Sequence, residues 1–278
     1  MPVAFALFAW WFLTGAVLYI VGFQRTRVPW TMAGATLIGI LALYAIYATA
    51  ADATVASAFI AFSAALLVWG WHEVSFLTGL ITGPRTTPSP RGTTQRSALW
   101  PAIETLLYHE AAILVTALLL YALVGEGPNQ VALWTYLVLW VMRISAKLNF
   151  YLGVPNLSAE LLPQHLRYLE SYFHRRAMNL LFPVSVTVAT IAVVLLVQAA
   201  AAADATAFDQ TAFTLLATLM ALALLEHWMM VLPFAPEAMW QWGLASRKSP
   251  PEPIDTFSRD TDSKNPKLAP PQEAGAAA

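Results

Sequence analysis

Histidine and glutamate side chains stand next to one another inside apolar stretches of this sequence, as in His72-Glu73, His109-Glu110 and Glu226-His227. A neutral imidazole nitrogen can ligate a metal ion, including the central metal of a tetrapyrrole, and a carboxylate can bridge metals or carry a proton. The candidates for cofactor binding and metal ligation are four histidines and four glutamates: His72, His109, His165 and His227, with Glu73, Glu104, Glu110 and Glu226.

These residues have three interpretations, which the sequence leaves open. They are polar groups hydrogen-bonded across helices, or a contact for a pigment or other tetrapyrrole, or a His/carboxylate metal site with oxidative chemistry. The sequence contains neither HExxH nor a paired ExxH motif, so no standard soluble metal signature applies. It also has no cysteine, which excludes thiolate sites and disulfides.

The elements that must position these residues are membrane helices. Of the 278 residues, 58% are hydrophobic and 11% are charged, whereas a soluble domain carries about 25% charged residues. A span needs roughly 20 mostly apolar residues, and its backbone must be helical because lipid offers no hydrogen-bond partners. Seven stretches qualify: Val3–Phe23, Thr31–Thr49, Thr54–Leu80, Leu99–Val124, Val131–Tyr151, Leu180–Ala202 and Thr211–Leu232. The predicted fold class is therefore an all-α, polytopic membrane helix bundle.

The basic residues favour one orientation of this bundle. The connections after the second, fourth and sixth spans contain acidic residues but no Lys or Arg, and all basic residues lie at or near the other connections and the tail. The positive-inside rule then predicts that the N-terminus is periplasmic and the C-terminus is cytoplasmic. Two of these basic residues, Arg143 and Lys147, lie inside the fifth span near its cytoplasmic end, where we expect them to extend toward the lipid headgroups.

Two segments are not predicted to span. The segment 157–177 contains an amphipathic helix, because Leu162, Leu166, Leu169 and Phe173 repeat at helical spacing and form one apolar stripe. We expect this helix to lie at the cytoplasmic interface of a transmembrane domain that covers residues 1–245. Residues 246–278 are rich in proline and alternating charges, which predicts a disordered cytoplasmic tail.

The predicted orientation places several candidate residues in the same half of the membrane. At about 1.5 Å per residue, His72 lies roughly 12 Å, His109 roughly 15 Å and Glu104 about 8–10 Å from the cytoplasmic end of its helix. His227 lies within about 8 Å of that end. Ionisable groups in a bilayer usually face the bundle interior and serve a function, so we expect a His/Glu cluster there.

Four segments resemble a known family. They are HEVSFLTGLITGPR (72–85), KLNFYLGVPNL (147–157), LPQHLRYLESYFHRRAMNLLFPVSVT (162–187) and EHWMMVLPFAPEAMWQW (226–242). These segments are similar to the photosynthetic complex assembly protein 2 family (PuhE), which is encoded with reaction-centre genes in anoxygenic phototrophic bacteria. The resemblance covers nearly all of the chain except the tail. It implies a multi-pass protein of the bacterial cytoplasmic membrane, but it implies no catalytic residues.

Two functional hypotheses follow from the residues and the resemblance together. The favoured one is a non-enzymatic factor that supports assembly of the reaction centre and light-harvesting complexes, or supplies bacteriochlorophyll to them. Its expected partners are membrane lipids, reaction-centre or light-harvesting subunits and pigment, and no nucleic acid. The alternative is a membrane metalloenzyme that acts on a tetrapyrrole or another lipophilic substrate through the His/Glu cluster. The cofactor is therefore bacteriochlorophyll, a metal ion or neither, and a transport function is the weakest hypothesis because no internal repeat is visible.

Overall fold

The computed structural model describes residues 1–22, 25–90, 92, 94–157, 161–233 and 236–247. Within them, seven helices are long and apolar enough to cross a membrane, which confirms the predicted fold class. Most of the predicted tail lies outside the described residues, so the tail remains a prediction. The seven helices are α1 (Pro2–Val21), α2 (Val28–Thr49), α3 (Val55–Leu77), α5 (Leu107–Val124), α6 (Val131–Leu152), α7 (Leu181–Ala200) and α8 (Ala207–Met229).

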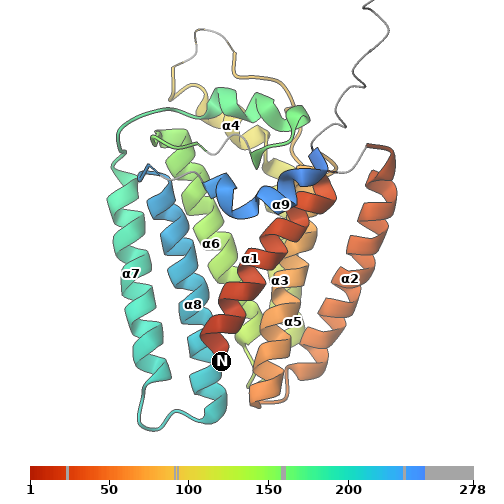
Figure 1. The fold of residues 1–278 in the computed structure, drawn as a ribbon, viewed down its shortest axis with the longest axis vertical. Coiled ribbons are helices and arrows are strands. Elements are labelled where there is room, and N and C mark those ends of the chain that lie inside the picture. Colours follow the sequence, from red (N-terminus) through yellow and green to blue (C-terminus); the bar gives the residue numbers. More distant parts are fainter. Residues whose placement is uncertain (23–24, 91, 93, 158–160, 234–235, 248–278) are drawn as a thin grey trace, which may run out of the picture. The chain divides into compact units, whose positions relative to one another are not determined.

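Helix α3 is the centre of the bundle. It packs against α1, α2, α5, α6 and α8, as the ribbon in Figure 1 illustrates. In its most apolar window 56% of the residues are buried, compared with 11% in the peripheral α7. Small buried residues such as Ala58, Ala61 and Ala65 allow the neighbouring helices to approach α3 closely.

The two ends of the bundle differ in charge. One end, here named the basic end, carries the short helices α4 (Leu99–Glu104), η3 (Gln164–Tyr172) and α9 (Gln241–Leu244), which lie together at the top of Figure 1. The acidic end carries the α2–α3, α5–α6 and α7–α8 connections, with Asp52, Glu126 and Asp204. Every described Lys and Arg side chain lies at or toward the basic end: Arg27, Arg85, Arg96, Arg143, Lys147, Arg167, Arg175 and Arg176.

The prediction of one continuous fourth span from Leu99 was wrong. The helix breaks after α4 at Thr105 and Leu106, and α5 begins at Leu107. The loop that follows α3 inserts at this break: the Thr82 carbonyl accepts a hydrogen bond from the His109 backbone N–H (2.8 Å). A tertiary contact thus replaces the helical hydrogen bonds there, and His109 lies in the first turn of α5, not about 15 Å along the helix as predicted.

The amphipathic segment is shorter and more tightly wound than predicted. It forms a 3₁₀-helix, η3, and residues 158–160 of the predicted range lie outside the described residues. The predicted stripe does face the protein: Leu166 and Leu169 are buried against Phe76 and Leu77, and Leu162 and Phe173 pack beside them. Three residues per turn also bring Tyr172 onto this face. Burial raises the pKa of Tyr172, and its hydroxyl donates to the Thr87 carbonyl (3.0 Å).

The chain returns to α1 after α8. The short helix η4 (Pro236–Trp240) and α9 pack on α1, followed by η5 (Ala245–Arg247). Trp240 Nε1 donates to the Trp11 carbonyl, and Trp11 Nε1 donates to the Met239 carbonyl, each at 3.0 Å. Glycine is needed at Gly243, because a Cβ there would lie 2.5 Å from the Gly15 carbonyl oxygen. The last described segment is therefore fixed against the first helix.

Candidate functional site

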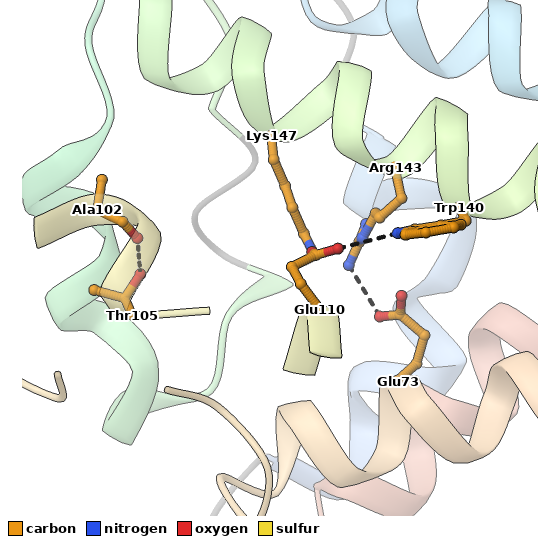
Figure 2. A network of polar contacts seen from close by, with 7 residues as sticks. All are labelled: Glu73, Ala102, Thr105, Glu110, Trp140, Arg143 and Lys147. Carbon is orange, nitrogen blue, oxygen red and sulfur yellow. Dashed lines mark hydrogen bonds and ion pairs between the residues drawn. The ribbon is translucent and has the colours of Figure 1, made fainter. Parts of the chain in front are cut away.

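A partly buried ion pair joins the central helix to α6. Arg143 Nη2 of α6 lies 2.9 Å from Glu73 Oε2 of α3. The Glu73 side chain is only 13% exposed, whereas that of Arg143 is 40% exposed. Figure 2 shows the guanidinium of Arg143 pointing from α6 toward this carboxylate.

A second carboxylate is held by the same helix. Glu110 of α5 accepts from Lys147 Nζ through Oε1 (2.6 Å) and from Trp140 Nε1 through Oε2 (3.1 Å). The donors project from one face of α6, because their positions follow the helical spacing i, i+3, i+7: Trp140, Arg143 and Lys147. Figure 2 shows both carboxylates meeting this face. We name Glu73, Glu110, Trp140, Arg143 and Lys147 the α6 charge network.

The expectation that Arg143 and Lys147 extend to the lipid headgroups was wrong. Both cations turn inward, because carboxylates of α3 and α5 lie within hydrogen-bond distance of them. A charge inside a membrane protein is stabilised most effectively by an opposite charge with good geometry. The network therefore fastens α3, α5 and α6 together near the basic end.

Glu226 is the third carboxylate inside a span, and it has a different partner. Its Oε1 accepts a hydrogen bond from Trp10 Nε1 of α1 (2.8 Å). Glu226 is an exposed residue of α8. It lines two neighbouring cavities of about 290 and 240 Å³. Arg143 lines both of the same cavities. The charged residues that line both cavities thus come from α6 and α8.

His72 and His109 lie close together in the core. Their ring centroids are 6.3 Å apart, and each residue is 1% exposed. His72 Nε2 is hydrogen-bonded to the Thr116 hydroxyl (3.0 Å), and the Nδ1 atoms of both rings have no partner among the described residues. Each of these two rings therefore has one nitrogen that is available to hydrogen-bond or ligate a further group.

His227 belongs to a separate network. Its Nδ1 lies 2.9 Å from the Ala223 carbonyl, and its Nε2 lies 2.9 Å from the Ser145 hydroxyl oxygen. Both nitrogens are therefore used within the bundle. The network continues through residues of α6, α7 and the α6–α7 connection: Ser185, Asn149 and Asn179.

Glu104 and His165 lie in the short helices α4 and η3 of the basic end. Glu104 is in α4 and accepts from Arg85 Nε (2.8 Å), and this hydrogen bond raises the pKa of Arg85. His165, on η3, lies against Gly79, where an added Cβ would be 3.1 Å from its ring. Gly79 has a φ of +79°, which favours glycine. Neither residue is joined to His72 by a described contact.

The predicted residues therefore gather at one end but do not form one cluster. Among the described residues, no group of three or more His, Asp or Glu side chains is placed to hold a metal ion. The four candidate glutamates instead accept from Arg85, Arg143, Lys147 and Trp10. This arrangement can fasten helices and present polar groups to a cavity.

Sequence reasoning missed the neutral partners of these groups. Thr116, Ser145, Asn149 and Asn179 carry much of the polar network, yet none was a candidate. A signal was present in the sequence, because Ser145 and Asn149 are polar residues one turn apart within an apolar span. Asn179 precedes the next span, and its side-chain oxygen accepts from the first N–H groups of α7.

The fold and site define a polytopic membrane protein whose helices are joined by buried polar networks near one end. The chain belongs to the family described as "Protein of unknown function (DUF3623)", which matches residues 1–251. It is also 38% identical to a protein of Rhodobacter capsulatus described as "Uncharacterized 30.4 kDa protein in puhA 5'region". This similarity covers 89% of the chain and 92% of the relative. No solved structure matches the chain.

Proposed function

We propose that this protein is a non-enzymatic membrane factor that supports assembly of the photosynthetic reaction centre and light-harvesting complexes, or the supply of bacteriochlorophyll to them. The observation that carries the proposal is its similarity, over nearly the full length of both chains, to a protein encoded in the puhA 5' region. The resemblance of the four segments to the PuhE family supports the same role. The protein acts in the bacterial cytoplasmic membrane, with its N-terminus in the periplasm and its basic end in the cytoplasm.

The polar contacts favour a scaffold over an enzyme. Each span glutamate accepts from a donor on a different helix: Glu73 from α6, Glu110 from α6 and Glu226 from α1. Such contacts fix the relative positions of helices. A rigid bundle with charged connections at one end is suited to holding nascent subunits in the membrane.

A second candidate function is a pigment or metal contact at His72 and His109. The specific observation is that both rings have a buried Nδ1 without a partner among the described residues. A neutral imidazole nitrogen of this kind can ligate a metal ion or the central metal of a tetrapyrrole. The other predicted ligands, His165, His227 and the four glutamates, are not part of this pair, and the candidate contact does not use them.

A deletion strain tests the main proposal. In a phototrophic host that lacks the gene, the absorption bands of the reaction centre and light-harvesting complexes should fall and should recover when the gene is restored. Normal levels of both complexes in the deletion strain would overturn the assembly role. The restored gene with His72→Gln and His109→Gln separates the candidates, because a plain scaffold tolerates these changes and a pigment or metal site does not.

The pigment and metal content of the purified protein tests the candidates independently of the deletion strain. Elemental analysis and an absorption spectrum in detergent distinguish three results. Bound bacteriochlorophyll supports a carrier, stoichiometric metal without pigment supports the metalloenzyme, and neither supports the plain scaffold.

A further inference from the structure

Two cavities meet inside the basic half of the bundle. The one nearer the basic end has a volume of about 290 Å³ and the one nearer the membrane centre about 240 Å³. They share five lining residues: Thr14, Arg143, Ala146, Leu161 and Glu226. The two volumes are therefore neighbouring parts of one passage, with Ala146 and the two charged residues at the junction.

The passage is long and narrow. Its lining extends along α6 from Leu139 to Tyr151 and along α8 from Leu219 to Met229. At 1.5 Å per residue these stretches measure roughly 15–18 Å. Drug-sized ligands occupy pockets of about 300–1,000 Å³, so volumes of 290 and 240 Å³ in series suit an extended chain better than a ring system.

The polar groups at the junction have complementary hydrogen-bonding capacity. Glu226 Oε1 accepts from Trp10, and its second oxygen has no described hydrogen bond and can accept from a ligand. Arg143 uses Nη2 for Glu73, and the guanidinium carries further N–H donors on a side chain that is 40% exposed. Glu226 and Arg143 thus place one acceptor and one donor at the junction, whereas Lys147 lines only the first cavity and Glu73 only the second.

We propose that this passage binds a long-chain aliphatic alcohol, with its hydroxyl at Glu226 and Arg143 and its chain along the apolar walls. A hydroxyl is the smallest group that donates to a carboxylate and accepts from a guanidinium at the same time. A carboxylate head could accept from Arg143 but would meet the like charge of Glu226, and an ammonium head could donate to Glu226 but would meet the like charge of Arg143. The alcohol site goes beyond the proposed assembly role and does not depend on it.

Binding is tested with the full chain in lipid nanodiscs. Tritiated dodecanol should bind saturably, at about one equivalent per chain, by scintillation proximity. Unlabelled dodecanol should compete about tenfold better than dodecanoate, which cannot donate to Glu226, and than dodecylamine, whose ammonium cannot accept from Arg143. Absence of saturable binding, or stronger competition by dodecanoate or dodecylamine, would overturn the proposal without affecting the result from the deletion strain.

Two substitutions on α6 locate the site. Ala146→Phe fills the junction and should weaken dodecanol binding at least about tenfold. Leu148→Phe is the matched control, because Leu148 is 43% exposed and lines neither cavity. Equal binding by the two variants would place the alcohol elsewhere and overturn the assignment.

Two substitutions of Glu226 test the head group. Glu226→Leu should abolish the preference for dodecanol over dodecane as a competitor, and Glu226→Gln should retain it because the amide oxygen still accepts. If the leucine variant keeps the preference, Glu226 does not recognise the hydroxyl. Should a variant fail to fold, the competition series on the unaltered protein still decides the proposal.

Discussion

Glu73 and Arg143 lie 2.9 Å apart across the α3–α6 interface, and the carboxylate is the more deeply buried partner. The asymmetry decides which change is more harmful. Removing Arg143 leaves a buried carboxylate without its cation, whereas removing Glu73 leaves a cation that still faces the cavities.

We predict that Arg143→Met destabilises the protein by about 2 kcal/mol, which is between the values typical of exposed and of buried pairs. Glu73→Gln should cost less, and the double substitution should recover part of the loss. Thermal or urea unfolding in detergent measures the three free energies. Strict additivity of the two single effects would show that the pair is not coupled.

Replacing His227 should reduce stability without changing any bound ligand. Both of its ring nitrogens are already hydrogen-bonded, to Ala223 and Ser145. His227→Leu should therefore cost about 1–3 kcal/mol, because the hydrogen bonds of the ring to Ala223 and Ser145 are lost in the core. The measurement is the unfolding free energy together with the pigment and metal content. A loss of pigment or metal from a folded His227→Leu variant would contradict this assignment. The pigment and metal content of a His72→Leu variant is measured for comparison.

The break between α4 and α5 depends on Gly83. A Cβ at this position would lie 2.0 Å from the Glu104 carbonyl oxygen, so Gly83→Ala should destabilise the protein by more than about 1 kcal/mol. Gly34→Ala, in the interior of α2, is the matched control. Apart from the neighbouring backbone of α2 itself, no atom lies within 4 Å of its added Cβ, and the substitution should stabilise the protein by about 0.5–1 kcal/mol through helix propensity. Thermal unfolding of both variants measures this, and equal melting temperatures would contradict the close approach of the loop.

The orientation of the bundle is open to direct measurement because the chain contains no cysteine. We predict that Arg96→Cys, at the basic end, is protected from a membrane-impermeant maleimide added to intact cells. Ala203→Cys, in the α7–α8 connection, should be labelled. The reverse pattern would place the basic end in the periplasm and would remove the basis for the predicted cytoplasmic tail.

The spans could be predicted because they depend on a local property. Apolar length alone locates α1 and α2 to within a few residues, and lipid enforces helical backbone. The break at Thr105 could not be predicted in this way, because it depends on a hydrogen bond from His109 to Thr82 that only the folded chain brings together. The same limit applies to η3: the prediction of its apolar stripe was correct, and the prediction of its helix type was wrong.

The candidate site was predicted in part. Residue type indicated that Glu73, Glu110 and Glu226 would face the bundle, since isolated charges are costly in lipid. The partners of these residues depend on helix rotation and neighbour order, which a single sequence does not give. Arg143 and Lys147 were therefore placed at the headgroups, although they bind two of the carboxylates that had been regarded as metal ligands.

The return of α9 to α1 has a consequence for biosynthesis. Helix α1 is synthesised first, yet its principal neighbours include α8 and α9, which are synthesised last. Helix α1 therefore lacks most of its lateral contacts in the bilayer until translation is almost complete. We infer that docking of Trp240 beside Trp10, with ring centroids 5.2 Å apart, is a late event in maturation. A chain that ends at Met229 should hold its first helix loosely, and weak crosslinking between α1 and α8 would reveal this.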